Sequence, residues 1–209
     1  MLQLQLGYKA GPEQFPPTTL LQNAIDAEKA GFDTLDVSDH FNPWSEEGQA
    51  AFTWTWLGAL ATHTSRMHMG TGITCPILRY HPSIIAQAAA TLSCFAPGRI
   101  YLGVGTGEAL NEYPSTAMWP EYEEREARLI EAIDLIRQLW SGKEVTFVGK
   151  YYRNKIACNS ANADDHIKFA TQYIDLGFNQ LFFHSAHPDQ RAFLQRYAND
   201  VLPQLRQKK

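Results

Sequence analysis

TLDVSDH (residues 34–40) is a short apolar run that ends in an acid and an imidazole. The run predicts a β-strand, and the preceding segment predicts a helix over about 18–30 that Gly31 is suited to end. Another short strand, LQLQLGY (2–8), precedes that helix and alternates apolar with polar residues. A strand, a helix and a strand at this spacing indicate a right-handed parallel βαβ unit.

The same unit recurs through the first half of the chain. Further strands are predicted at MHMGTGI (67–73) and IYLGVGT (100–106), so that strands begin about 33 residues apart. Helices are predicted over 49–63 and from Pro82, which suits a first helical position, to about 95. This rhythm predicts an α/β fold with parallel strands.

The second half of the chain departs from the rhythm. A long helix is expected to begin at Pro120 and to end at Gly142, with one buried stripe formed by Leu129, Ile133, Ile136 and Trp140. The elements predicted after it are a hairpin over 145–152, a helix over about 164–176, a strand at NQLFFH (179–184) and a closing helix over 188–206.

Five parallel-type strands are too few for a complete (β/α) barrel, which has eight strands and typically about 250 residues. The chain has 209 residues. We therefore expect TIM-barrel-type βα units in an incomplete barrel of about five strands, with three expected strands absent. The expected organisation is a single truncated barrel domain over 1–209, with a junction at 156–162 where about three βα units are missing.

Composition and charge exclude several classes of function. The net charge is −4, and no block of five or more like charges occurs, so nucleic acid and membrane surfaces find no support as partners. No segment approaches the roughly 20 apolar residues of a membrane span, and the first residues lack the layout of a signal peptide. The three cysteines have no CxxC spacing, so we expect no metal site. These features predict a cytoplasmic protein.

Polar and titratable side chains gather where the predicted strands end, although the strand bodies are apolar. Ligands of parallel α/β folds bind at these carboxyl ends. The side chains in question are Tyr8, Lys9 and Glu13 after the first strand, Asp39, His40 and Trp44 after the second, Thr71 to Thr74 on the third, Thr106, Glu108 and Asn111 after the fourth, and His184 after the last. We therefore expect a small-molecule site at this end of the sheet.

The residue types suggest proton-coupled hydride transfer to a planar ring. His40 can accept a proton at neutral pH, and Glu108 is a second acid or base. Trp44 offers a flat apolar wall, and the glycines of GVGTG (103–107) let backbone approach a flat ligand. A histidine that only makes structural hydrogen bonds remains the alternative. The segment GVGTGE is not the GxGxxG fingerprint of a dinucleotide site.

Five motifs at these positions resemble a known family. They are LGYKAGPEQF, VSDHFNPW, MGTGITCP, RYHPSIIAQAAATL and GVGTGEALNE. Together they resemble the luciferase-like barrel family, in its branch that uses the deazaflavin coenzyme F420, and within it the glucose-6-phosphate dehydrogenases. The similarity runs over 2–155 and resumes over about 162–206.

The resemblance implies an oxidoreductase of carbohydrate metabolism and assigns its catalytic residues. His40 corresponds to the family's base, which accepts the proton of a C1 hydroxyl while the hydride passes to C5 of the deazaflavin. Trp44 corresponds to the indole that helps to stabilise the developing negative charge. Glu108 corresponds to the acid directed at N1 of the ring.

The resemblance also implies which residues bind the ligands. Cofactor-binding positions fall on Asp39, Gly72, Ile73, Thr106, Gly107 and Asn111. Substrate-binding positions fall on Glu13 and Trp44. The family's non-proline cis peptide falls on Gly72–Ile73.

The missing middle leaves the substrate and the function open. The family's fifth to seventh strands carry the basic residues that hold a sugar phosphate, and these strands are the ones expected to be missing. The expected substrate is therefore either a sugar-phosphate hemiacetal or an alcohol without a phosphate. Three alternatives to an F420-dependent dehydrogenase remain: a shortened, non-catalytic deazaflavin- or flavin-binding relative, a luciferase-like monooxygenase with FMN, and a fragment that binds no ligand. Uncovered sheet edges favour a homodimer, a re-paired sheet or a longer natural chain.

Overall fold

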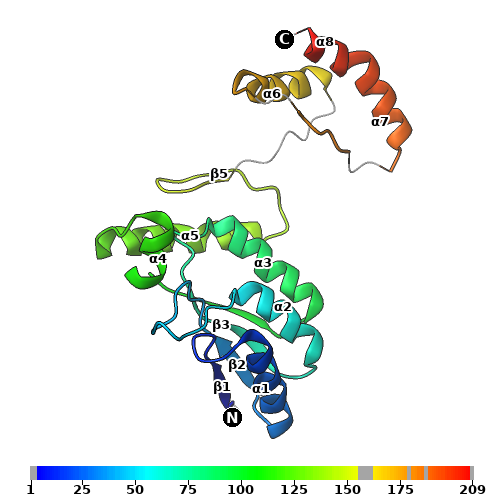
Figure 1. The fold of residues 1–209 in the computed structure, drawn as a ribbon. Helices are drawn as coiled ribbons and strands as arrows, with labels where there is room; N and C mark the ends of the chain where they lie inside the picture. The colour runs from blue at the N-terminus through cyan, green and yellow to red at the C-terminus, as the bar shows by residue number, and fades with distance from the viewer. Residues whose placement is uncertain (1–3, 155–161, 178–179, 186–187, 208–209) are drawn as a thin grey trace. The chain divides into compact units, whose positions relative to one another are not determined.

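The computed structural model describes residues 4–154, 162–177, 180–185 and 188–207. The chain divides into two compact units, Met1–Asn154 and Lys155–Lys209, and each is described by itself. Figure 1 shows the elements of both units. The predicted junction at 156–162 lies outside the described residues, except for Asn162.

A four-stranded parallel sheet forms the centre of the N-terminal unit. Its strands are β1 (Gly7–Ala10), β2 (Thr34–Val37), β3 (His68–Thr74) and β4 (Ile100–Val104), and they are neighbours in chain order. The four predicted strands and their parallel pairing are thereby confirmed. The sheet does not close into a barrel. The first strand begins at Gly7, later than predicted. Gly7 pairs with Thr34, the first residue of β2, so residues before Gly7 have no strand residue of β2 to pair with.

Four helices pack against one face of this sheet. They are α1 (Pro17–Ala30), α2 (Thr53–His63), α3 (Pro82–Phe95) and α5 (Tyr122–Leu139). The core beneath them contains Leu35 and Met69 from the strands, both fully buried, and Trp54 and Trp56 from α2. Gly31 ends α1 with a φ of 102°, a left-handed conformation that glycine adopts without steric cost.

The opposite face of the sheet is more polar. Asp36 lies between Leu35 and Val37 on β2, so its side chain projects away from the helices. Lys9 of β1 donates hydrogen bonds to the Asp36 carboxylate at 3.3 Å and to the carbonyl oxygen of Gly72 at 2.5 Å. These contacts join three neighbouring strands across this face.

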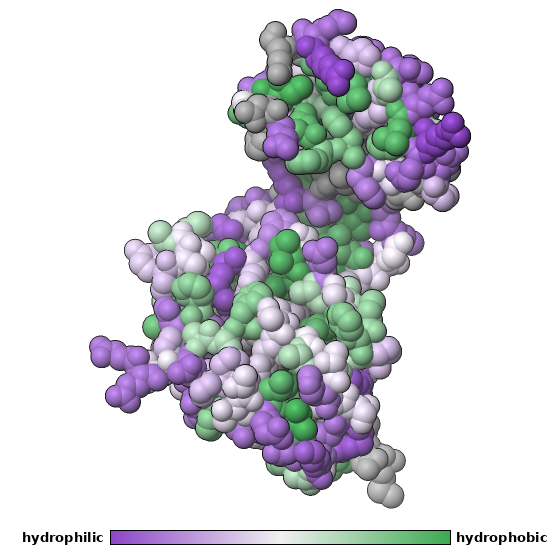
Figure 2. Space-filling model, turned by 45° about the vertical axis from the view of Figure 1, so that its right-hand side comes forward, coloured by the Kyte–Doolittle hydropathy of each residue, from purple (hydrophilic) through white to green (hydrophobic). Residues whose placement is uncertain are grey.

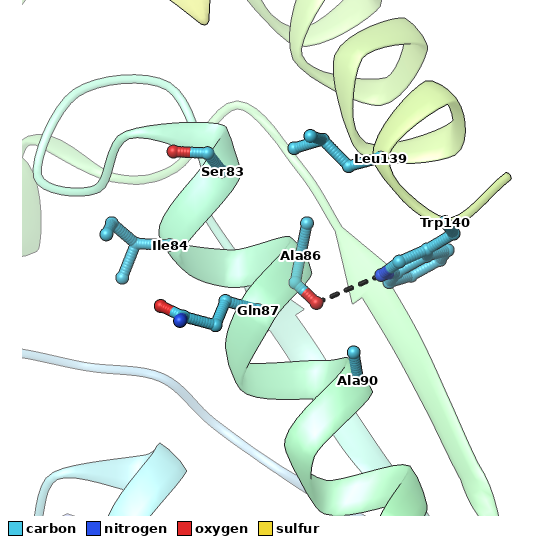
Figure 3. Close-up of a pocket in the computed structure, with 7 residues that line it drawn as sticks. All are labelled: Ser83, Ile84, Ala86, Gln87, Ala90, Leu139 and Trp140. Atoms are coloured by element: carbon cyan, nitrogen blue, oxygen red, sulfur yellow. Dashed lines mark hydrogen bonds between the residues drawn. The ribbon is translucent and has the colours of Figure 1, made fainter. Parts of the chain in front are cut away.

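Helix α5 differs from its predicted amphipathic stripe. Its buried residues are Ala132, Leu135 and Ile136, whereas Trp140 follows the helix and is 46% exposed. The indole Nε1 of Trp140 donates a hydrogen bond of 2.9 Å to the carbonyl oxygen of Ala86, at a surface groove between α3 and α5 (Figure 3). The prediction that Trp140 is a core residue is therefore wrong, because the indole covers α3 from outside.

The predicted hairpin is formed by β5 (Phe147–Val148) and β6 (Arg153–Asn154), which pair antiparallel. The carboxylate of Glu131 on α5 accepts hydrogen bonds from the backbone N–H groups of Lys150, Tyr151 and Tyr152, at 2.7–3.0 Å. A single side chain thus holds the hairpin turn against α5.

All regular secondary structure among the described residues of the C-terminal unit is helical. It contains α6 (Ala163–Asp175), α7 (Gln190–Arg196), a π-helical turn (Tyr197–Val201) and α8 (Leu202–Arg206). The core residues are Ile167, Ala170, Tyr197, Val201 and Leu205. Figure 2 shows apolar residues gathered on the visible face of this unit. A hollow of about 340 Å³ in the unit is lined mainly by aromatic side chains.

The predicted fifth strand is wrong for residues 180–184, which have no strand structure; Asn179 lies outside the described residues. A strand needs a hydrogen-bonded neighbour, and no strand occurs among the described residues of this unit. The closing helix is confirmed but interrupted. Pro203 has no backbone N–H, and the N–H of Leu202 bonds to the carbonyl oxygen of Tyr197, five residues back.

None of the helices in the described ranges has the length and apolarity that a membrane crossing requires.

Candidate functional site

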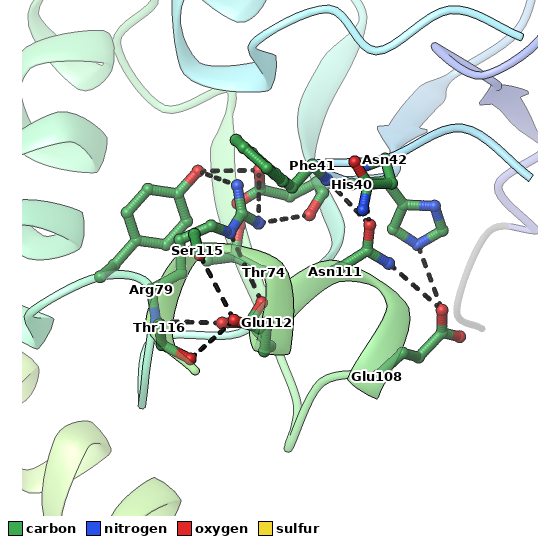
Figure 4. A network of polar contacts seen from close by, with 12 residues as sticks. His40, Phe41, Asn42, Thr74, Arg79, Glu108, Asn111, Glu112, Ser115 and Thr116 are labelled. Carbon is green, nitrogen blue, oxygen red and sulfur yellow. Dashed lines mark hydrogen bonds and ion pairs between the residues drawn. The ribbon is translucent and has the colours of Figure 1, made fainter. Parts of the chain in front are cut away.

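The loop after β2 and the helix after β4 form one polar cluster at the carboxyl ends of the strands (Figure 4). The helix, α4 (Ala109–Thr116), was not predicted, because its sequence is polar and contains Pro114. It begins two residues after Gly107, whose φ of 78° turns the chain from the strand toward the helix. The sequence GTGEALNE is therefore a strand end, a turn and a helix start.

His40 lies at the edge of this cluster, between two carboxylates (Figure 4). Its Nδ1 lies 2.5 Å from Oε1 of Glu13, and its Nε2 lies 4.0 Å from Oε2 of Glu108. The indole of Trp44 approaches the imidazole edge-on, with ring centroids 5.9 Å apart. Since Nδ1 faces a carboxylate, it carries the proton of the neutral ring, and Nε2 keeps a free lone pair. Nε2 can therefore accept a proton from a ligand.

Glu13 is the buried partner of this histidine, with a side chain only 1% exposed. Burial acts to raise the pKa of Glu13, but its contacts with His40 and with its own backbone outweigh burial and bring the pKa below its usual 4.5. Glu13 is thus an anion at neutral pH. A buried anion beside Nδ1 orients the imidazole.

The Glu13 contact predicts a dependence of stability on pH. A carboxyl with a depressed folded-state pKa stabilises the fold above its unfolded pKa of 4.5, and this contribution is lost as the pH falls through the folded-state pKa. Glu13→Gln is therefore expected to reduce the free energy of unfolding at neutral pH and to differ less from the parent near pH 3. Urea unfolding of both proteins across this range measures the difference. A difference in unfolding free energy that does not change with pH would contradict a depressed pKa for Glu13.

Asn111 fixes the loop that carries the histidine. Its buried side-chain oxygen accepts hydrogen bonds from the backbone N–H groups of Phe41 at 2.9 Å and Asn42 at 3.1 Å. Its amide nitrogen donates to Glu108 at 3.3 Å. In this structure Asn111 therefore joins α4 to the β2 loop; its predicted contact with a cofactor remains a prediction.

Asp39 belongs to a buried network behind the histidine. Its carboxylate accepts hydrogen bonds from the hydroxyls of Thr74 at 2.8 Å and Tyr80 at 3.0 Å, and Arg79 lies 3.4 Å away. Burial, and then the Asp39 charge, raises the pKa of the Tyr80 phenol, which keeps its proton as a donor. Both oxygens of Asp39 are thus occupied within the protein, and its contact with a cofactor also remains a prediction.

Arg79, Tyr80 and Glu112 were not singled out by sequence reasoning. Glu112 is 1% exposed and accepts the backbone N–H of Arg79 at 3.0 Å. Burial raises the pKa of Glu112, while the hydrogen bonds and charge of Arg79 oppose this rise. Their positions inside the motifs RYHPS and GTGEALNE could have identified these residues, because a charged residue in a buried turn needs a partner of opposite charge.

The other predicted site residues lie on β3, in the loop after β2 and after β4, and one lies in the C-terminal unit. The cis peptide at Gly72–Ile73 is confirmed. Ile73 is 46% exposed and Trp44 is 61% exposed, and the Glu108 side chain is also open to solvent. Thr106 and Gly107 are half-buried. His184 lies in the C-terminal unit, where it lines the aromatic hollow.

The open side suits a flat heteroaromatic ring better than a metal ion. The exposed side chains of Ile73, Trp44 and Phe41 offer apolar surface to such a ring, and His40 and Glu108 offer polar atoms. Among the described residues, no group of three or more His, Cys, Asp or Glu side chains is arranged to hold a metal.

Comparisons with known proteins relate this chain to longer enzymes. It is 51% identical over 158 residues to the F420-dependent glucose-6-phosphate dehydrogenase of Mycolicibacterium smegmatis, a match over 74% of this chain and 47% of that protein. The enzyme of the same name from Nakamurella multipartita is 52% identical over 151 residues, a match over 72% of this chain and 44% of that protein. The chain spans about half the length of the curated relatives it matches.

Solved structures give a related picture. An F420-dependent secondary alcohol dehydrogenase, solved with an F420–acetone adduct, matches 99% of this chain and 64% of its own, with a TM-score of 0.73 and 36% identity. The coenzyme F420 dependent tetrahydromethanopterin reductase of Methanopyrus kandleri matches 74% of this chain and 45% of its own, with a TM-score of 0.62 and 25% identity. The model of the family described as luciferase-like monooxygenase matches residues 1–205. The chain therefore belongs to the luciferase-like family.

Proposed function

We propose that this chain is an F420-dependent oxidoreductase that oxidises an alcohol or a sugar-phosphate hemiacetal, with His40 as the base. The observation that carries the proposal is the orientation of His40, whose Nδ1 is held by buried Glu13 while Nε2 faces the open side of the cluster. Support comes from relatives named for F420-dependent oxidation of glucose 6-phosphate and from the structural similarity to an F420-dependent alcohol dehydrogenase.

The chemistry of the protein's own residues follows from this geometry. Nε2 of His40 accepts the proton of the substrate hydroxyl as the carbon becomes a carbonyl, and Glu13 stabilises the imidazolium that forms. The Trp44 indole, in edge contact with His40, offers an N–H donor and excludes water from one side. Glu108, linked to Asn111, is the proposed acid that serves the cofactor ring.

The residues present fit a deazaflavin ring. Ile73 and Trp44 would bind its faces, and the glycine-rich end of β4, with Thr106 and Gly107, would approach it through backbone. A bound deazaflavin supplies the two-electron acceptor that takes the hydride at C5. Asp39, Gly72 and Asn111 would hold the surrounding backbone in place.

A second candidate is a non-catalytic relative that binds a deazaflavin or a flavin. The observation that favours it is that the chain spans about half the length of its curated relatives. We retain as further proposals a single truncated barrel domain over 1–209 and a homodimer.

A fluorescence titration of coenzyme F420 tests the proposed function. We expect saturable quenching by the full chain, followed by substrate-dependent loss of oxidised cofactor with an alcohol or glucose 6-phosphate. Ile73→Glu is expected to weaken binding, because it places a charge on the proposed wall. Ile130→Glu, a change at an exposed isoleucine within α5, is the matched control. Binding without turnover would favour the non-catalytic candidate, and no binding would refute both.

A further inference from the structure

The backbone on both sides of His40 is held by two consecutive residues of one helix. Asn111 and Glu112 lie on α4 and are 3% and 1% exposed. Asn111 accepts the N–H of Phe41, which belongs to the peptide bond after His40. The peptide bond before His40 is held on the other side, through Arg79 and Glu112.

This second contact begins at the carbonyl oxygen of Asp39. Arg79 Nη2 donates to this oxygen at 2.7 Å, and the Arg79 side chain is only 9% exposed. Glu112 in turn fixes Arg79, since Oε2 accepts the Arg79 backbone N–H at 3.0 Å and Oε1 lies 3.5 Å from Nε. Glu112 therefore reaches the peptide bond of His40 through one intermediate residue.

We propose that Glu112, acting through Arg79, is a positioning residue that sets the orientation of the His40 imidazole toward Glu13. The inference rests on the proposed function only in that it treats His40 as the reactive base. Among the described residues, the ion pairs of the His40 ring are with Glu13 and Glu108, and no hydrogen bond or ion pair joins the ring to Glu112 or Arg79. Their effect on the ring is therefore transmitted through the backbone of residues 39–41.

The network has a feature that a purely structural ion pair does not need. Arg79 donates to a backbone carbonyl and to the Asp39 carboxylate, and it also pairs with the Glu112 carboxylate at 3.5 Å, so its planar fork fixes the direction of one peptide bond. A displacement of a catalytic group by about 1 Å can cost on the order of 10²-fold in rate. Restraint on both peptide bonds that flank His40 limits such displacement.

The test is the tautomer of His40, read from ring ¹⁵N resonances of the full chain without cofactor or substrate. In the parent, Nδ1 is expected to carry the proton because it faces Glu13. Glu112→Gln keeps the shape of the side chain but removes the charge that holds Arg79, so the His40 resonances are expected to move toward the values of a mixed tautomer. The His40→Gln spectrum assigns the signals.

A matched control separates positioning from general loss of stability. Glu28 also accepts backbone N–H groups, those of Ser65, Arg66 and Met67 at 2.7–3.1 Å, but at the opposite ends of the strands. Glu28→Gln is expected to lower stability and to leave the His40 resonances in place. If Glu112→Gln does not fold, Arg79→Lys replaces it, because lysine keeps the charge but lacks the fork.

Folded Glu112→Gln or Arg79→Lys with unchanged His40 resonances would overturn the inference. With turnover established, kcat of these variants is expected to fall on the order of 10²-fold with a much smaller change in KM, since the ring moves and the binding surface stays. A parent that binds no F420 would refute the proposed function and leave the resonance test intact, so the two failures are distinguishable.

Discussion

His40→Ala is expected to lower kcat by about 10²- to 10⁴-fold and to leave the affinity for coenzyme F420 close to that of the parent. The imidazole is the group of the cluster whose free nitrogen, Nε2, can accept a hydroxyl proton, because Nδ1 already faces Glu13. The cofactor walls proposed above, Ile73 and Trp44, remain in place in this variant. Steady-state kinetics with reduction of F420, together with the fluorescence titration, measures both quantities.

Two companion variants make the result interpretable. Alanine leaves Glu13 buried without its partner, so His40→Gln, which can still donate to that carboxylate, separates loss of the base from loss of the contact. His63→Ala removes an exposed histidine at the end of α2 and is expected to keep full activity. Substantial turnover by His40→Gln would rule out His40 as the base.

Local sequence signals were sufficient for most of the N-terminal unit. Alternating or apolar runs that end at glycines, together with Pro82 at a first helical position, are read over a few neighbouring residues. The predicted strands at 34–40, 67–73 and 100–106 accordingly overlap β2, β3 and β4. The cis peptide at Gly72–Ile73 came from the family resemblance, since no local pattern specifies it.

Features that depend on distant partners were missed or wrong. The apolar run at 179–184 resembles a strand, but residues 180–184 have no hydrogen-bonded neighbour among the described residues of their unit. The contact between Glu13 and His40 joins two loops, and the contact between Glu112 and Arg79 joins a turn and a helix. Sequence reasoning identified Glu13 and His40 as polar strand ends but could not give their separation.

The largest effect on stability is expected from Arg79→Met. Removal of one partner from a buried ion pair typically costs about 3–5 kcal/mol, because the other charge stays buried without compensation. Two carboxylates would lose their cation here, those of Asp39 and Glu112, each with a side chain only 1% exposed. Arg79 also lies over the Tyr80 ring at 4.4 Å, a contact that methionine makes without charge.

Thermal and urea unfolding would measure this loss, and a fall in Tm of roughly 2–4 °C per kcal/mol is expected for a chain of this size. Arg66→Met is the matched control, since its pair with Asp33 is half exposed and exposed pairs are worth up to about 1 kcal/mol.

The deficit of Arg79→Met should also depend on pH. Burial already raises the pKa of Glu112, and loss of Arg79 removes the interactions that oppose this rise. The unpaired carboxylate therefore destabilises the fold above its raised pKa, and protonation relieves the penalty as the pH falls. Arg79→Met/Glu112→Gln should recover part of the loss at neutral pH, because only Asp39 then remains an unpaired anion. Equal losses for Arg79→Met and Arg66→Met, independent of pH, would show that the buried network does not stabilise the strand ends.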